Sequence, residues 1–383
     1  LPGLRVTSRQ STKRYKDSEL PAADIAGELG VDALVEGSLL GKGSKIELTV
    51  QLIDGRSDEH IWAERYMRET PYVFSLISDM ANAIGAEISS SSASPRVEGV
   101  NREERIRPVD PRAIDAYSLG LTHMDRFTPD GIRFAIDQFE RAVEIEPAFA
   151  LAWGQLGAAH SMLGLYGYAP PRESKEKLRA AVLQAIEADD QVFIGHSGLG
   201  WVQWWTGDFD AGCESFEEAL RLNPSAPYAI HGDADCLMFE GRMDESIARL
   251  RELVTISPFS VMHSLPLPYH LYVARRFDEA ISAAQEMQVR SPQFSMHWFL
   301  AKVYWQQGRC DEAMEQERLE FEGRGNTVLL AAMEEGVDAA GPTGAMRAMA
   351  ETLVARASET YVDPFDIAEA FARAEMVDET LYW

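Results

Sequence analysis

The sequence predicts a mainly α-helical protein, in which a superhelix of helical hairpins follows a small α+β domain. Three observations predict this fold class. Proline recurs every 34 residues, at Pro224, Pro258 and Pro292, and a six-residue turn pattern recurs ahead of these prolines. Apolar and polar residues alternate between Ile46 and Leu52, which indicates a half-buried strand near the N-terminus. The length of 383 residues suffices for two or three domains.

Composition narrows the class of function. The chain is 46% hydrophobic and 25% charged, as in ordinary globular proteins, which excludes a disordered or collagen-like chain. Its net charge of -25 would repel a phosphate backbone, so we expect no direct nucleic-acid binding. No apolar run reaches the roughly 18 residues of a membrane helix. The three cysteines, Cys213, Cys236 and Cys310, are far apart, so we expect neither a disulfide framework nor a cysteine zinc site.

The N-terminal part alternates between helix and strand signals. The expected elements are a short β-prone run from Leu4 to Ser8, a helix from Pro21 to Leu29, and strands from Asp32 to Leu40, Ile46 to Leu52 and Ile61 to Met67. Gly30 fits the left-handed residue that ends a helix. Short polar turns separate the strands, which predicts an antiparallel meander.

A helix is expected after the meander, with Thr70 as its cap and Pro71 in its first turn. Its apolar stripe is Val73, Ile77, Met80, Ile84 and Ile88. A serine-rich and then charged stretch follows. The predicted organisation is therefore an α+β domain over 1–92, a linker over 93–111 and a solenoid over 112–383.

The turn pattern of the second part reads glycine, any residue, apolar, aspartate, any residue, small. It occurs from Gly207, from Gly241 and from Gly308, and again from Arg275 with the glycine replaced. Glycine can adopt the left-handed conformation that ends a first helix, and aspartate can cap the second. The pattern predicts about six helical hairpins between Pro111 and Arg324, with further helices beyond them.

These positions resemble the tetratricopeptide repeat. Leu199-Gly200, Phe216, Ala219 and Pro224 match its pattern in order. Trp153, Leu156-Gly157, Ala181 and Ala185 fit another, longer copy. The resemblance implies an α-solenoid that binds a protein or peptide on the face formed by its first helices.

The first part resembles the TolB-like amino-terminal domain of bacterial signalling proteins. The residues that carry this are Leu4 to Arg9, Glu28 to Ser38, Glu47 to Asp54 and Ile61 to Tyr66. In that family the domain begins with another strand and helix, so the sheet here is expected to be incomplete, with an exposed edge. Family members carry an upstream winged-helix domain, protein kinase or nucleotide cyclase. The resemblance thus implies the regulatory half of such a protein.

Motifs for catalysis are weak. Gly195 to Leu199 is similar to a hydrolase nucleophile elbow around Ser197, but its fifth residue is not glycine and it falls on a predicted helix. Gly41 to Lys45 lacks the spacing of a phosphate loop and is predicted as a hairpin turn. The histidines, His263 among them, show no metal-ligand spacing and are expected to be packing or surface residues. We predict no catalytic residue, no metal and no cofactor.

Aromatic residues dominate the predicted inner face of the repeats, where positions follow one another at three or four residues. The candidate groove residues are Trp201, Trp204, Tyr228, His231, Tyr269, Tyr272, Trp298, Lys302 and Trp305. Three occupants remain open: the chain's own α+β domain or C-terminal helices, a protein or peptide partner, or a small apolar ligand. Pro266 and Pro268 interrupt one first helix, which weakens the assignment of Tyr269.

The function predicted from these observations is a non-catalytic interaction and regulatory module of a bacterial signalling protein. The alternative is a fragment of an enzyme, with a cyclase or kinase upstream or a cryptic serine hydrolase around Ser197. A homo-oligomer is compatible with either. The expected location is the cytoplasm by default, or the periplasm if a membrane helix precedes this chain in its parent.

Overall fold

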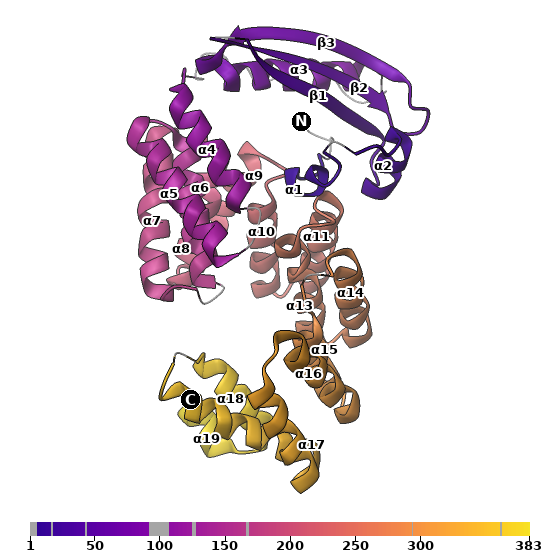
Figure 1. Ribbon diagram of the computed structural model, residues 1–383, viewed down its shortest axis with the longest axis vertical. Coiled ribbons are helices and arrows are strands. Elements are labelled where there is room, and N and C mark those ends of the chain that lie inside the picture. Colours follow the sequence, from indigo (N-terminus) through magenta and orange to yellow (C-terminus); the bar gives the residue numbers. More distant parts are fainter. Residues whose placement is uncertain are drawn as a thin grey trace. The chain divides into compact units, whose positions relative to one another are not determined.

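The computed structural model describes residues 6–16, 18–42, 44–91, 107–124, 128–165, 168–292, 294–360 and 362–383. They form two compact units, Leu1–Pro266 and Leu267–Trp383. The fold class is the predicted one, a helical solenoid preceded by a small α+β part (Figure 1). The predicted linker lies mostly outside the described residues.

The α+β part contains a three-stranded antiparallel sheet in the order β1-β2-β3. Its elements are α1 (Arg9–Lys13), α2 (Ala22–Leu29), β1 (Ala33–Lys42), β2 (Lys45–Asp54) and β3 (His60–Glu69). The meander prediction is confirmed, and Gly30 ends α2 at φ 65°. Residues 6–8 form no strand, contrary to the β-prone run expected there, because Ser8 caps α1; residues 4–5 lie outside the described residues.

Helix α3 (Val73–Ser91) packs on β2 and β3, but two expectations about it are wrong. A 3-10 turn over Thr70–Tyr72 precedes the helix, and the Thr70 hydroxyl donates to the Ser44 carbonyl instead of capping it (3.1 Å). Ile77 is 45% exposed, whereas Leu76 is fully buried. On a helix Leu76 lies about 60° to one side of Val73 and Ile77 about 40° to the other, and the sheet lies on the Leu76 side.

The described residues between Pro111 and Arg324 form six helical hairpins, in agreement with the predicted number of about six. Their helices are α4 (Pro111–Met124) with α5 (Pro129–Ile145), α6 (Ala150–Leu165) with α7 (Pro171–Ala188), α8 (Phe193–Trp205) with α9 (Phe209–Leu222), α10 (Pro227–Phe239) with α11 (Met243–Ile256), α12 and α13 (Val261–Ser264 and Pro266–Val273) with α14 (Phe277–Arg290), and α15 (His297–Gln306) with α16 (Cys310–Arg324). Pro266 interrupts the fifth first helix, as expected. The further helices are α17 (Thr327–Ala357), α18 (Pro364–Arg373) and α19 (Val377–Tyr382).

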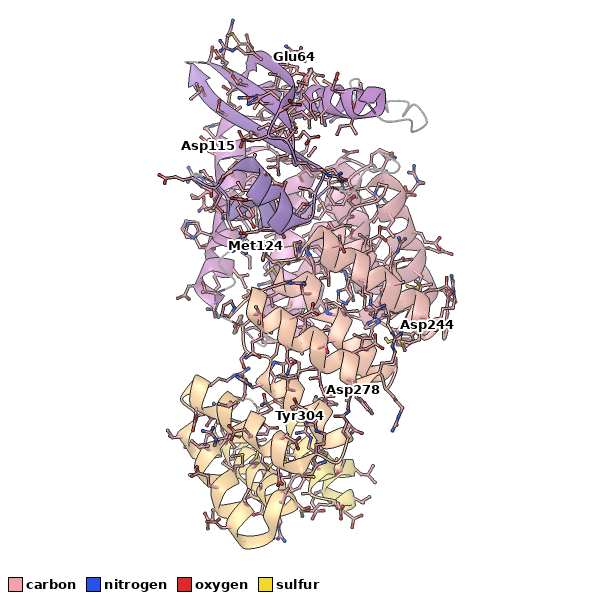
Figure 2. The ribbon with its side chains drawn as sticks, turned by 90° about the vertical axis from the view of Figure 1, so that its right-hand side faces the viewer. Glu64, Asp115, Met124, Asp244, Asp278 and Tyr304 are labelled. Atoms are coloured by element: carbon pink, nitrogen blue, oxygen red, sulfur yellow. A yellow bond between two sulfur atoms is a disulfide. The ribbon has the colours of Figure 1, made fainter. Side chains whose placement is uncertain are left out.

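The hairpin turns confirm the glycine prediction and correct the aspartate prediction. Gly207, Gly241 and Gly308 have φ of 86°, 79° and 73°, and Arg275 takes the same left-handed conformation at 58°. The recurring aspartates do not occupy the cap position, because each second helix begins at the preceding apolar residue. They lie in the first turn, where the partial positive charge of the helix N-terminus favours a carboxylate. Figure 2 labels two of them, Asp244 in the first turn of α11 and Asp278 in the first turn of α14.

A disulfide joins Cys213 on α9 to Cys236 on α10, with 5.9 Å between the Cα atoms. The expectation that the cysteines do not pair is therefore wrong. Stacking places the second helix of one hairpin beside the first helix of the next, so residues 23 apart in the sequence become neighbours.

Reducing this disulfide is expected to lower the free energy of unfolding by about 3 kcal/mol, because closing a loop of this length restricts the unfolded chain. Denaturant unfolding of the full chain with and without dithiothreitol measures the difference. The variant Cys213→Ser/Cys236→Ser should not respond to the reductant. Identical unfolding curves for the oxidised and reduced parent would show that the bond does not contribute.

Candidate functional site

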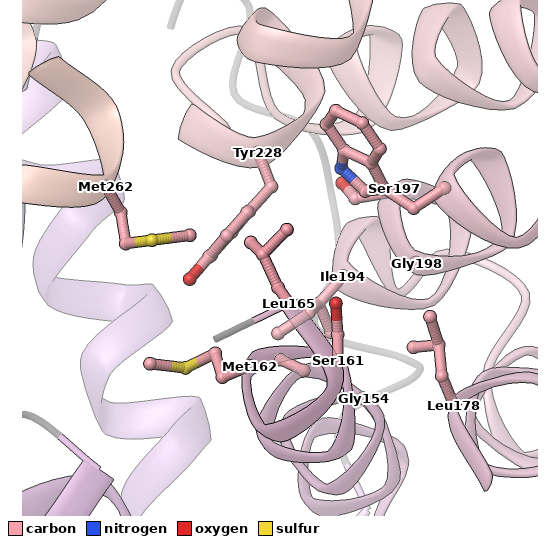
Figure 3. A pocket seen from close by; sticks show the side chains of 12 residues that line it. Gly154, Ser161, Met162, Leu165, Leu178, Ile194, Ser197, Gly198, Tyr228 and Met262 are labelled. Carbon is pink, nitrogen blue, oxygen red and sulfur yellow. The ribbon is translucent and has the colours of Figure 1, made fainter. Parts of the chain in front are cut away.

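A cleft of about 40 Å³ lies in the first unit among α6, α7, α8, α10 and α12. It is formed mainly by the first helices of consecutive hairpins. Its lining residues are Gly154, Ala158, Ser161, Met162, Leu165, Leu178, Ile194, Ser197, Gly198, Trp201, Tyr228 and Met262. In Figure 3 Tyr228 and Met262 point toward each other across one side, and Leu178 lies on the other.

The walls of the cleft are almost wholly apolar. The Ser197 hydroxyl donates to the Phe193 carbonyl of its own helix (3.0 Å), so it is already satisfied. The volume corresponds to roughly three water molecules, which is room for the end of one aliphatic side chain. Such a surface favours an apolar group over water.

Two glycines allow the helices around the cleft to approach closely. A Cβ atom on Gly154 of α6 would overlap Ile194 of α8. A Cβ atom on Gly198 would lie 2.5 Å from Val182 of α7. Any larger residue at either position would therefore push the cleft walls apart.

The structure separates the predicted groove residues of the first unit. Trp201 and Tyr228 line the cleft. His231 lies beside it, with its ring 4.9 Å from that of Trp201 and its Nε2 atom 3.7 Å from Asp235. Trp204 does not line the cleft; its ring packs against those of Phe209 and Phe239, at 5.0 and 4.9 Å.

Behind the cleft wall lies His263, whose ring packs edge-on against Tyr228 at 5.3 Å. His263 is buried, and neither ring nitrogen has a hydrogen-bond partner among the described residues. Burial, together with the smaller effect of the nearby His231, lowers the pKa of His263 to about 3. The imidazole is therefore neutral at physiological pH and serves as packing, as expected.

In the second unit two of the predicted groove residues, Lys302 and Trp305, contact the chain's own helix α18. The Lys302 ammonium lies 2.9 Å from a Glu369 carboxylate oxygen and 5.5 Å from the Phe365 ring centroid. Arg373 pairs with Glu317 at 3.0 Å and lies 5.9 Å from the Trp305 ring centroid. These charged side chains are mostly buried, which strengthens their attraction.

The remaining predicted residues of that unit differ in exposure. Trp298 lies beside Phe299, with 5.8 Å between ring centroids, and Lys302 is 5.8 Å from its ring. Tyr272 packs against the Phe277 and Phe299 rings, and burial raises its pKa. Tyr269 is 49% exposed.

The hydrolase alternative lacks its geometry. Ser197 lies inside α8 rather than on a sharp turn, and the His196 Nε2 atom is 2.9 Å from the Asp190 carbonyl oxygen. Within the described ranges there is no group of three or more His, Cys, Asp or Glu side chains suited to a metal ion. Nor does any described helix have the length and apolarity to cross a membrane.

Sequence reasoning missed the contribution of α6 to the cleft. Gly154, Ala158, Ser161 and Leu165 are spaced by four, three and four residues, the same spacing that placed Trp201 on the inner face. These residues carry the same helical spacing, but they are small or aliphatic and so are not part of the aromatic pattern that predicted the inner face.

Comparison with known proteins agrees with the repeat assignment. Residues 197–261 and 269–322 match the model of the tetratricopeptide repeat family, so this region consists of tetratricopeptide repeats. A curated protein of Rhizobium meliloti (strain 1021), named putative adenylate cyclase 3, is 28% identical over 210 residues, which are 54% of this chain. The chain spans about a third of that relative's length, 35%.

Similar solved structures include a thermophilic tetratricopeptide repeat protein of Thermus thermophilus. It is 15% identical with a TM-score of 0.42, over 50% of this chain and 99% of that one. Human IFIT1, solved as a dimer with m7Gppp-AAAA, is 13% identical with a TM-score of 0.48, over 82% of this chain and 78% of that one. These are likenesses of fold.

Proposed function

We propose that this chain is a non-catalytic interaction and regulatory module, and that its first-unit cleft takes an apolar side chain of a protein or peptide partner. The observation that carries the proposal is the open apolar cleft formed by the first helices of consecutive tetratricopeptide repeats. Trp201 and Tyr228 supply the aromatic part of the contact surface. Aromatic side chains in such positions contribute strongly to protein binding.

The second unit supports a peptide-like occupant. There the predicted groove residues Lys302 and Trp305 already contact an amphipathic helix, α18, through ion pairs and ring contacts. These internal contacts support a helical peptide as the kind of occupant that such repeat residues bind. In the first unit no described segment fills the cleft, which leaves it available to a partner.

Filling the cleft is expected to weaken partner binding. The variant Ser161→Leu adds an isobutyl group to the wall, where it competes with a partner's apolar side chain. Peptides selected from a displayed random library on the full parent chain should bind this variant about 10- to 100-fold more weakly, since burial of one such side chain contributes about 1.5–3 kcal/mol.

The matched control is Ser118→Leu, the same change at an exposed position of the first helix α4. It should bind the selected peptides as the parent does. Equal affinity of both variants, or a failure to select any peptide on the parent, would contradict the cleft as the binding site.

A second candidate follows from the cyclase relative: the chain is the regulatory half of a nucleotide cyclase. It is supported by the 210-residue match and by the TolB-like pattern of the first part. In this proposal the TolB-like domain covers 1–92, the linker 93–111 and the repeats 112–383. A chimera of the relative that carries this chain's matching residues should keep cyclase activity, and Ser161→Leu should alter that activity. An inactive chimera that folds would contradict the assignment.

A further inference from the structure

The N-terminal helix α1 contacts a turn 248 residues away in the sequence. The Ser8 amide donates to the Ile256 carbonyl at 2.8 Å, and the Phe259 amide donates to the Ser11 hydroxyl at 3.3 Å. Ser11 is fully buried. The Arg14 guanidinium lies 4.0 Å from the centroid of the Phe259 ring. Two hydrogen bonds and a cation–π contact therefore hold α1 on the turn between α11 and α12.

This turn leads directly into a wall of the cleft. It ends where α12 begins, and α12 places Met262 in the cleft and His263 against Tyr228. The helix has only four residues, too few to be stable by itself. The buried hydroxyls of Ser257 and Ser260 have no hydrogen-bond partner among the described residues. The part of the cleft wall that α12 forms is therefore stabilised by contacts with neighbouring elements.

The α+β part has a second attachment, to the first two hairpins. The Val109 amide donates to the Pro71 carbonyl at 3.0 Å. The Phe74 ring at the start of α3 lies 6.4 Å from Tyr117 of α4 and 5.4 Å from Phe149, which precedes α6. The same α+β part thus contacts the solenoid ahead of the first cleft helix, α6, and again at the turn that precedes the last cleft helix, α12.

We propose that the α+β part is a clasp across the first four hairpins, and that docking of α1 holds Met262 and α12 in the position that forms the cleft. A signal that releases α1 would then weaken partner binding, because the ligand and the docked helix favour the same arrangement. The effect on binding rests on the proposed function of the cleft, whereas the effect on α12 does not.

Amide hydrogen exchange of the full chain tests the clasp. The double variant Ser11→Ala/Arg14→Ala removes the hydroxyl acceptor and the cation. We expect the amides of Ser264 and Leu265, which bond within α12, to exchange at least about 10-fold faster, while the amides of α5 stay protected. The control Lys16→Ala removes an exposed positive charge on the same segment and should leave α12 unchanged.

Unchanged exchange of Ser264 and Leu265 in the double variant would overturn the proposal, whatever happens to α1. Peptides selected on the parent should also bind the double variant at least about threefold more weakly. Faster exchange in α12 without any peptide binding to the parent would leave the clasp in place and remove only the proposed function of the cleft.

Discussion

Replacing Phe216 by alanine is expected to lower the free energy of unfolding by about 3–5 kcal/mol. The ring is fully buried between two neighbouring first helices. A Cβ atom on Gly200 of α8 would lie 2.5 Å from it, and a Cβ atom on Gly232 of α10 would also overlap it. Because helices held this close cannot move into the vacant space, the substitution leaves a cavity.

Denaturant unfolding of the two-unit chain, followed by circular dichroism, measures this loss. Phe209→Ala is the matched control, because that ring is 41% exposed on the same helix and its removal should cost about 1 kcal/mol. Gly232→Ala should be destabilising as well, since the added methyl group meets the Phe216 ring. If Phe216→Ala lowered the free energy of unfolding no more than Phe209→Ala does, the packing of the Phe216 ring between α8 and α10 would not stabilise the hairpins.

Local patterns predicted the repeat architecture because each repeat encodes its own turn. Three signals lie within a single hairpin: the glycine that ends the first helix, the apolar residue that starts the second helix, and the proline that follows the second helix. Gly207, Gly241 and Gly308 show the result directly. The position of the recurring aspartates was less predictable, since one residue of shift in the helix start changes a cap into a first-turn residue.

Contacts between distant segments could not be predicted from the sequence. The pairing of Cys213 with Cys236 depends on how one hairpin stacks on the next. The contact of Lys302 with Glu369 depends on where α18 lies, and no pattern within α18 specifies this. Such contacts depend on the fold as a whole. The sequence pattern therefore did not specify which residues of the predicted inner face are in contact with α18, as Lys302 and Trp305 are.

Which aromatic residues of α8 line the cleft could not be predicted from the sequence either. Trp201 and Trp204 are three positions apart, so their side chains diverge by about 60° around the helix. That angle is enough to place one ring in the cleft and the other against Phe209 and Phe239. Helical spacing alone assigns Trp201 and Trp204 to the same face of α8, and therefore predicted both as groove residues.

Acidification below pH 6.5 is expected to destabilise the protein through His263. Its pKa in the folded state is lowered to about 3 by burial, whereas the unfolded chain has the ordinary value of about 6.5. Above pH 6.5 both states are neutral and the group has no effect. Between pH 6.5 and about pH 3 only the unfolded state takes up the proton, so the free energy of unfolding decreases as the pH is lowered.

At pH 5 the loss from His263 is about 2 kcal/mol, because each pH unit below 6.5 contributes about 1.4 kcal/mol. His160, whose pKa burial lowers to about 4, adds a similar amount. The variant His263→Leu should therefore lose about 2 kcal/mol less than the parent between pH 7 and pH 5, measured by urea unfolding at each pH. The exposed His60 gives the control His60→Leu. An acid loss in His263→Leu equal to that of the parent would show that this imidazole accepts a proton in the folded state, and the wall behind Tyr228 would then be open to water.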